Sequence, residues 1–213
     1  RVSAMLTVHH LNNSRSQRIL WLLEELGLEY QLKTYQRDPV TNLAPPELEQ
    51  VHPLGKSPVL TDDDATIIES GAIIDYILRH YGDGRLQPET GTQHYEQYLQ
   101  WLHYAEGSAM LPMMLKMYTA RLGDAGAPLQ PRIVDELQRH LGYIENALQD
   151  VDWLVDNCFS GADIQLSFVV EITPLLYSLE ELPNIAAYRQ RLQQRPAYRA
   201  ALERGGFYAY GSG

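Results

Sequence analysis

The stretch HHLNNSRSQRILWLLEELGLEY, residues 9–30, decides the fold of this chain, because it contains the end of a strand, a polar loop and an amphipathic helix in that order. Apolar side chains over residues 19–26 recur with the spacing of one helix face. Gly27 follows at the position where helices often end in a left-handed residue. Ser14 and Gln17 have the spacing of a capping box, which predicts that the helix starts at Ser14.

Segments typical of strands lie on both sides of this helix. Residues 6–11 precede it, and residues 30–35 follow it with alternating apolar side chains, which predicts a strand–helix–strand unit with parallel strands. Farther along, residues 57–61 and 66–68 are separated by three aspartates and predict an antiparallel hairpin. Ser70 then stands where it can cap a further apolar helix. The pattern indicates an α/β fold with the order βαβ–ββα.

A segment without periodicity divides the chain. Residues 83–92 collect Gly, Pro and polar side chains, which is typical of an interdomain linker. We therefore expect an α/β domain over residues 5–82 and an all-helical domain over residues 93–213. Pro112 and Pro174 are expected to kink or break two of its helices. The helices expected in this second domain span residues 94–122, 129–149, 161–178 and 184–204.

One motif in the helical domain predicts a structural role. Ser160 and Asp163, in the run SGAD, have the spacing of a capping box, and Phe159 with Ile164 adds a hydrophobic staple. The motif therefore predicts helix nucleation at this point, without a part in the chemistry.

The charge balance of the 213-residue chain excludes several partners. With 17 Lys and Arg against 27 Asp and Glu, the net charge is −10, which opposes broad binding to nucleic acid or to an anionic membrane surface. No apolar run approaches the ~18 residues of a membrane span, and no secretory signal opens the sequence. A cytoplasmic protein is expected.

Cysteine and histidine content narrows the chemistry further. The single cysteine, Cys158, excludes an internal disulfide, a Cys-x-x-Cys redox pair and a Cys-rich zinc site. We expect Cys158 to be a buried small apolar side chain. His9 and His10 are adjacent on a strand and point to opposite faces, so no metal site is predicted from them.

Four segments together carry a resemblance to a known family. They are residues 9–30, the loop HPLGKSPVL at residues 52–60, the pair Glu69 and Ser70, and SGADI at residues 160–164. In order and spacing they resemble the cytosolic glutathione S-transferase superfamily over essentially the whole chain, closest to a serine-type, theta-like branch of fungi and bacteria. The resemblance implies a thioredoxin-like first domain, an all-helical second domain and a homodimer. It also implies a role in detoxification.

The loop before Pro58 is expected to hold glutathione. In the family the matching proline is cis and exposes the main chain of the preceding residue, here Ser57, to the cysteinyl part of the tripeptide. The resemblance therefore implies a cis bond between Ser57 and Pro58. Lys56 matches a position that often contacts the glycyl carboxylate, and His52 is a second candidate for that contact.

Glu69 and Ser70 lie where the family binds the γ-glutamyl end of glutathione. A helix N-terminus offers free N–H groups and partial positive charge to a carboxylate, and the Ser70 hydroxyl adds a donor. Glu69 can meet the ammonium of the same moiety. The alternative is an ordinary N-cap, in which the Ser70 hydroxyl serves its own helix.

Transfer chemistry requires the glutathione thiol to ionise, since a free thiol has a pKa of about 8.5. Many relatives use a tyrosine near the first strand, but none of the 14 tyrosines precedes Tyr30. Ser14 is the first candidate donor to the thiolate, with Asn13 and backbone N–H groups as alternatives. Ser14 can instead be a pure N-cap, while Ser16 is expected to cap the helix or face solvent. The position of Cys158 argues against a mixed-disulfide mechanism.

The resemblance implies a pocket for a hydrophobic electrophile. Four of the five methionines fall on one face of a helix, and a polarisable methionine surface suits varied apolar ligands, although core packing is the alternative. The expected reaction is conjugation of the thiolate to the electrophile, with glutathione-dependent peroxidase activity as an addition. A non-catalytic binding or regulatory relative is the alternative. The expected pocket residues are Leu11, Asn12, Met110, Met113, Met114, Met117 and Tyr118.

Overall fold

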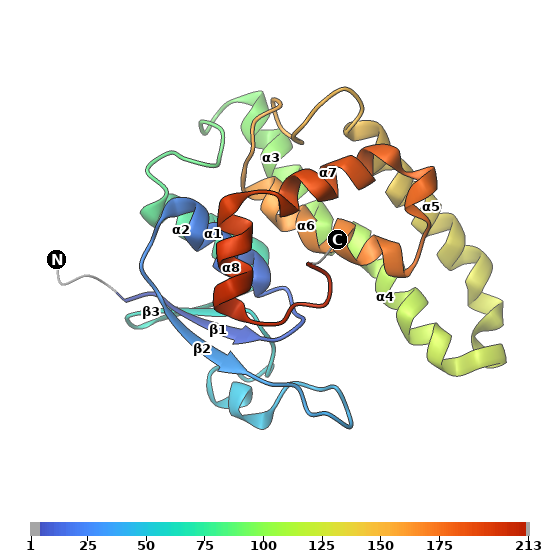
Figure 1. The fold of residues 1–213 in the computed structure, drawn as a ribbon, viewed down its shortest axis with the longest axis horizontal. Helices are drawn as coiled ribbons and strands as arrows, with labels where there is room; N and C mark the ends of the chain where they lie inside the picture. The colour runs from blue at the N-terminus through green and yellow to red at the C-terminus, as the bar shows by residue number, and fades with distance from the viewer. Residues whose placement is uncertain (1–4, 212–213) are drawn as a thin grey trace. The chain divides into compact units, whose positions relative to one another are not determined.

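The structure is a computed structural model that describes residues 5–211 (Figure 1). It contains two compact units. The first comprises the chain up to Leu86 together with the residues from Gln193 onward, and the second spans Gln87–Leu192. Residues 82–92 form neither helix nor strand, so the change of unit falls inside the predicted linker.

The first unit is built on a four-stranded sheet with the order β2-β1-β3-β4. Its strands are β1 (Thr7–Leu11), β2 (Gln31–Tyr35), β3 (Val59–Asp62) and β4 (Ala65–Ile68). The pairing of β1 with β2 is parallel, whereas β3 is antiparallel to both β1 and β4. This mixed sheet, with a helix between β1 and β2, confirms the predicted βαβ–ββα order and is the thioredoxin-like arrangement.

Helices and a short 3-10 segment cover the two faces of the sheet (Figure 1). One side carries α1 (Gln17–Leu26) and α2 (Ser70–Tyr81), together with α8 (Pro196–Gly205). On the other side, the 3-10 segment Pro46–Gln50 inserts Leu48 into a buried cluster with side chains of β1 and β2. Both faces of the central strand β1 are therefore shielded from water.

Helix α1 begins later than its capping pattern predicts. It starts at Gln17, and the expected capping box with Ser14 is absent, because the Ser14 hydroxyl instead accepts a hydrogen bond from the backbone N–H of Ser16 at 3.1 Å. The end of the helix is as predicted, since Gly27 has a φ of 66° and donates to carbonyls of the last turn.

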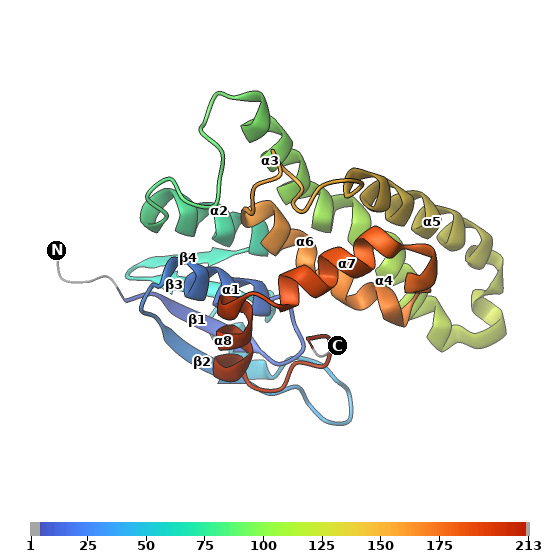
Figure 2. The same ribbon diagram turned by 45° about the horizontal axis from the view of Figure 1, so that its top comes forward.

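The packing of α8 corrects the predicted domain boundary. The helical domain was expected to extend over residues 93–213, and a single helix was expected over 184–204. Pro196 instead separates α7 (Pro183–Gln193) from α8, and α8 lies along α1 in the first unit (Figures 1 and 2). Helix α1 has buried apolar side chains on two sides. The sheet covers one side, and α8 covers the other.

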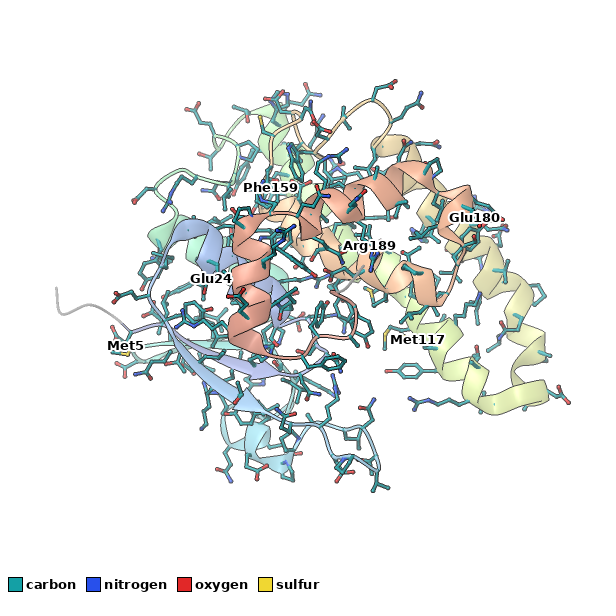
Figure 3. All side chains as sticks on the ribbon, in the orientation of Figure 1. Met5, Glu24, Met117, Phe159, Glu180 and Arg189 are labelled. Atoms are coloured by element: carbon teal, nitrogen blue, oxygen red, sulfur yellow. The ribbon has the colours of Figure 1, made fainter. Side chains whose placement is uncertain are left out.

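Specific contacts hold α8 on α1. The ring of Trp21 meets that of Tyr198 edge to face at a centroid distance of 5.1 Å. Glu25 accepts two hydrogen bonds from the Arg195 guanidinium, at 2.6 and 2.9 Å. Glu24, labelled in Figure 3, forms a further ion pair with α8. Because planar two-point pairs of this kind fix orientation as well as distance, α8 is held in one register against α1.

The second unit is all-helical, as predicted. An interruption occurs just before Pro112, which has no N–H to donate to the carbonyl of Ser108, so the chain forms a π-helical turn over Ala105–Ala109. Pro174 lies in the 3-10 turn Thr173–Leu175 that follows the helix ending at Ile172, which confirms its expected effect. The α-helices of this unit, besides α7, are α3 (Gln93–Tyr104), α4 (Met110–Thr119), α5 (Gln130–Ala147) and α6 (Gly161–Ile172).

The capping box at the start of α6 is present as predicted. The carboxylate of Asp163 is fully buried and accepts from the backbone N–H of Ser160 at 2.8 Å. It also accepts from the N–H of Leu154 at 3.1 Å and from the hydroxyl of Tyr188 at 2.7 Å. Burial raises the pKa of Asp163 to about 6. One side chain therefore satisfies donors from three separate segments.

Replacing Asp163 by alanine should destabilise the fold much more than removing the cap alone. The variant leaves buried donors without an acceptor, at about 1–3 kcal/mol each, so we expect a loss of about 3 kcal/mol or more in unfolding free energy. Ser160→Ala, the matched control, should lose about 1 kcal/mol. Chemical denaturation followed by circular dichroism measures both. Unchanged stability of Asp163→Ala with lost activity would show that the assignment to structure is wrong.

Candidate active site

The turn between β1 and α1 is held rigidly by one arginine. The Arg37 guanidinium donates to the carbonyl of Asn12 at 3.1 Å and to that of Asn13 at 3.2 Å. Its backbone N–H donates to the Asn12 side chain at 3.0 Å. Asn13 has a φ of 51°, and its side-chain oxygen accepts from the N–H of Ala209 at 2.8 Å. This turn therefore presents the following residue, Ser14, in a fixed position.

Ser14 lies at the entrance to α1. Its side chain is 6% exposed, and its Oγ is 2.7 Å from the Oγ of Ser16. Since α1 begins three residues later, Ser14 is next to the positive end of that helix, whose first N–H groups donate to carbonyls of the preceding turn, among them that of Ser14. A hydroxyl and a helix N-terminus thus lie together at the carboxyl end of β1.

Ser16 was not expected to be part of this site. The expectation that it caps the helix or faces solvent is wrong, because it is fully buried and makes no side-chain cap. Its Oγ is instead 2.7 Å from Nδ1 of His10. As predicted, His9 and His10 point to opposite faces, since His9 bonds the hydroxyl of Tyr35 and His10 bonds the carbonyl of Gly205. Strand alternation gives the direction of His10, but not its partners.

The loop before β3 is tied to the same end of β1. The bond between Ser57 and Pro58 is cis, which confirms the expectation from the family resemblance. The Ser57 hydroxyl donates to the carbonyl of His9 at 2.8 Å and accepts from the N–H of Leu11 at 3.2 Å. The main chain at Ser57 is therefore held beside the β1–α1 turn.

The two basic candidates of this loop differ in their surroundings. Lys56 is exposed, and its ammonium makes no contact that restricts it among the described residues. His52 is half-buried, and its Nδ1 accepts from the N–H of Leu54 at 3.3 Å. Nδ1 is thus the unprotonated nitrogen of His52, and Nε2 carries the proton.

At the start of α2 the structure corrects the N-cap interpretation of Ser70. The N-cap residue is Glu69, and Ser70 is the first residue of the helix. Glu69 is exposed with a φ of 67°, a backbone conformation that costs a non-glycine residue about 1–3 kcal/mol. Ser70 is buried, and its Oγ accepts from the Arg18 guanidinium at 3.1 Å. The Ser70 hydroxyl proton is therefore directed elsewhere than to Arg18.

Hydrogen bonds thus join the predicted segments of the first unit. Leu11 donates both to Ser16 at 3.3 Å and to Ser57 at 3.2 Å, which links the β1–α1 turn to the cis-proline loop. Arg18 links α1 to Ser70 at the start of α2. The N-termini of two helices and one loop converge where β1 ends, an arrangement suited to an extended anionic ligand.

The candidate pocket residues differ in exposure. Leu11 is buried with Tyr35 and Leu48 in the core of the first unit, and Asn12 is held by Arg37. In the second unit, the methionines of α4 divide into two groups. Met110 and Met113 are buried, Met114 and Met117 are half-buried, and Tyr118 is exposed (Figure 3 labels Met117).

A cavity of about 650 Å³ lies between α3 and α5 in the second unit. Its lining includes Trp101 and Tyr143, whose rings stack at 5.2 Å, and Tyr104, whose hydroxyl is 2.8 Å from Nδ1 of His140. None of the predicted pocket residues lines it. Its aromatic residues come from two helices distant in the sequence, so no local motif indicated the cavity.

Cys158 is exposed, contrary to the expectation that it is buried. It ends a turn in which Asp156 and Asn157 have φ values of 50°, and the turn directs it outward. Within residues 5–211, no group of three His, Cys, Asp or Glu side chains is arranged to hold a metal ion. In the same part of the chain, every helix is too short or too polar to cross a bilayer.

Comparison with known families identifies both halves of the chain. The model described as "Glutathione S-transferase, N-terminal domain" matches residues 3–79. The model described as "Glutathione S-transferase, C-terminal domain" matches residues 107–196. The two matches occur in the same order as the α/β and helical parts of the structure.

Individual proteins are similar over nearly the full length. Glutathione S-transferase 3 of Schizosaccharomyces pombe is 34% identical, and the alignment covers 94% of this chain and 88% of the relative. A solved glutathione S-transferase of Actinobacillus pleuropneumoniae is 34% identical with a TM-score of 0.89, covering 98% of this chain and 97% of that one.

A further solved structure contains a ligand. Glutathione transferase URE2P6 of Phanerochaete chrysosporium, in complex with oxidized glutathione, is 25% identical with a TM-score of 0.78 and covers 95% of this chain and 97% of its own. Family models, sequence and structure thus agree, and the chain belongs to the glutathione S-transferase family.

Proposed function

We propose that this protein conjugates the thiolate of glutathione to hydrophobic electrophiles and also reduces organic hydroperoxides with glutathione. Membership of the family supports glutathione transfer in general. The observation that carries the specific proposal is the position of Ser14, a buried hydroxyl beside the N-terminus of α1 and joined through hydrogen bonds to the cis-proline loop. Glutathione is the cosubstrate.

Glutathione is proposed to bind along the end of β1 through three groups of contacts. The exposed main chain of Ser57 pairs with the cysteinyl part of the tripeptide. The start of α2 and the Ser70 hydroxyl meet the γ-glutamyl carboxylate, while Glu69 meets its ammonium. Lys56 and the Nε2–H of His52 meet the glycyl carboxylate. The conformation of Glu69 supports this proposal, since strained exposed residues concentrate at ligand sites.

Ser14 is proposed to donate a hydrogen bond to the thiolate. A hydroxyl donor and the partial positive charge of a helix N-terminus both favour the ionised form of a thiol. The side-chain oxygen of Asn13 accepts from Ala209, and its amide N–H₂ is the group that could donate to the thiolate. Ser14 is our first choice over Asn13 because its hydroxyl lies closer to the start of α1 and is bonded to Ser16 beside it.

The thiolate, once formed, attacks the electrophile directly, so the chain contributes orientation and charge stabilisation and forms no covalent bond with the substrate. Met114 and Met117 are proposed to contact the electrophile, because they keep part of their polarisable surface exposed. Homodimeric assembly, a cytoplasmic location and a role in detoxification are parts of the same proposal and rest on the family resemblance.

Retention on immobilised glutathione, followed by turnover assays, tests the proposed function. We expect the protein to be retained and eluted by free glutathione, and to act on an aryl halide and on cumene hydroperoxide. Elution by free glutathione, with no elution by an unrelated anionic tripeptide, controls for charge. Retention without turnover on either substrate would favour a binding protein, and absence of retention would contradict the proposal.

Ser14→Ala should raise the apparent pKa of the bound glutathione thiol. Loss of one hydrogen bond to a charged group costs about 1.5–3 kcal/mol, or about 1–2 pKa units. The ultraviolet absorbance of the thiolate, measured against pH with glutathione bound, gives this value. Ser178→Ala, which removes an exposed serine from a turn in the helical unit, is the control. An unchanged thiol pKa in Ser14→Ala, with a raised one in Asn13→Ala, would assign the role to Asn13.

A further inference from the structure

A chain of buried hydrogen bonds runs from the end of α8 to Ser14. Nε2 of His10 is 3.1 Å from the carbonyl oxygen of Gly205, and Nδ1 of His10 is 2.7 Å from the Oγ of Ser16. The Oγ of Ser16 is in turn 2.7 Å from the Oγ of Ser14. His10, Ser16 and Ser14 are 3%, 0% and 6% exposed, so water does not compete for the two bonds that join them.

The carbonyl of Gly205 determines the tautomer of His10. A carbonyl oxygen can only accept, so Nε2 carries the proton and donates a hydrogen bond to the carbonyl of Gly205. Burial lowers the pKa of His10, with the Gly205 carbonyl acting in the opposite direction, so the ring is neutral at neutral pH. Nδ1 is then unprotonated, and it accepts a hydrogen bond from the hydroxyl of Ser16.

This tautomer also determines the direction of both serine hydroxyls. Ser16 has one proton, and the 2.7 Å contact with His10 is shorter than the alternative contact of 3.3 Å with the carbonyl of Leu11. Because Ser16 uses its only proton in the hydrogen bond to His10, Ser14 must be the donor in the 2.7 Å bond between the two serines. In this state Ser14 donates inward, its oxygen accepts from the backbone N–H of Ser16 at 3.1 Å, and its second lone pair is left for a thiol S–H.

We propose that His10, acting through Ser16 and Ser14, takes up the proton that the glutathione thiol loses. This inference rests on the proposed function. The S–H bond breaks as its proton passes to the oxygen of Ser14, the original proton of Ser14 passes to Ser16, and that of Ser16 passes to Nδ1 of His10. The products are a thiolate and an imidazolium, with no change of oxidation state and no other reactant.

The transfer reverses every hydrogen bond in the chain. The imidazolium donates to Ser16, Ser16 donates to Ser14, and the Ser14 hydroxyl proton now points outward to the thiolate. Ser14 thus changes from an acceptor of the thiol proton to a donor that stabilises the thiolate. His10 and Ser16 do not touch the thiol, and they are positioning residues that also hold the proton.

The surroundings of His10 allow this charge to form only together with the thiolate. Among the described residues, the groups that bond or pair with His10 from α1, β2 and α8 are the uncharged Ser16, Thr34 and Gly205, and no charged side chain is among the causes that shift its pKa. With no carboxylate among them, burial disfavours an imidazolium while the site is empty. A thiolate at Ser14 supplies the opposite charge, so that proton uptake and thiolate formation are coupled.

Counting protons tests the proposal in the unmodified protein. Glutathione is added at pH 7.5 in weak buffer with an indicator dye, and thiolate is measured by ultraviolet absorbance in the same sample. S-methylglutathione, which has no thiol proton, gives the background. We expect thiolate to form with no more proton release than S-methylglutathione causes. Release of one extra proton per thiolate would overturn the inference and leave the proposed function intact, whereas absence of thiolate would overturn both.

Two variants break the chain at different points. His10→Gln keeps a polar side chain that cannot take up the proton, and Ser16→Ala removes the link between His10 and Ser14. In both we expect one extra proton released per thiolate and a thiol pKa higher by about one unit, equal to about tenfold less thiolate below that pKa.

His9→Gln is the matched control, because it makes the same change one residue earlier, on the opposite face of β1, where the side chain bonds Tyr35. It should keep the proton balance of the unmodified protein. If His10→Gln and Ser16→Ala also keep that balance and an unchanged thiol pKa, the inference is wrong.

Discussion

The structure of the first unit depends on the burial of the junction between β1 and α1. This junction places polar groups, among them the backbone of Leu11 and the hydroxyl of Ser16, where water does not reach them. Each buried donor left without a partner costs about 1–3 kcal/mol, so the junction is stable only if the surrounding segments supply partners. The cis-proline loop supplies Ser57, and α8 supplies the Gly205 carbonyl. The need to satisfy the junction thus brings together segments that are far apart in the sequence.

Much of this arrangement could be predicted, because local patterns carry it. The opposite directions of His9 and His10, the glycine at the end of α1 and the capping box of Asp163 each depend on a few neighbouring residues, and all were found as expected. The cis bond at Pro58 came from resemblance to a family and not from any local energy. The role of Ser16 was misjudged because its partner, His10, lies six residues earlier on a different element, β1. The place of α8 was misjudged because its contact with His10 joins residues 195 positions apart, which no periodic pattern reports.

The net negative charge of the chain limits how the candidate site can attract an anionic ligand. A protein of net charge −10 repels an anionic tripeptide at long range, so the attraction has to come from groups close to the ligand. Two helix N-termini and the exposed Lys56 are such groups, and neither helix has an acidic residue in its first turn. The only cysteine of the sequence is exposed and belongs to the helical unit, and it is not part of the sequence segments that form the site. The sulfur chemistry of the proposed reaction therefore belongs to the bound ligand.

The C-terminal segment takes on a role that the family match alone does not indicate. The matched region ends at residue 196, where α8 begins, yet α8 buries Trp21 and its last carbonyl sets the tautomer of His10. The two effects are physically connected. The two-point pair between Glu25 and Arg195 fixes the register of α8 on α1, and that register places the Gly205 carbonyl 3.1 Å from Nε2. A shift of α8 along α1 by a fraction of a turn would remove this acceptor and free either nitrogen of His10 to carry the proton. The packing of the last helix and the direction of the Ser14 hydroxyl are thus set by the same contacts.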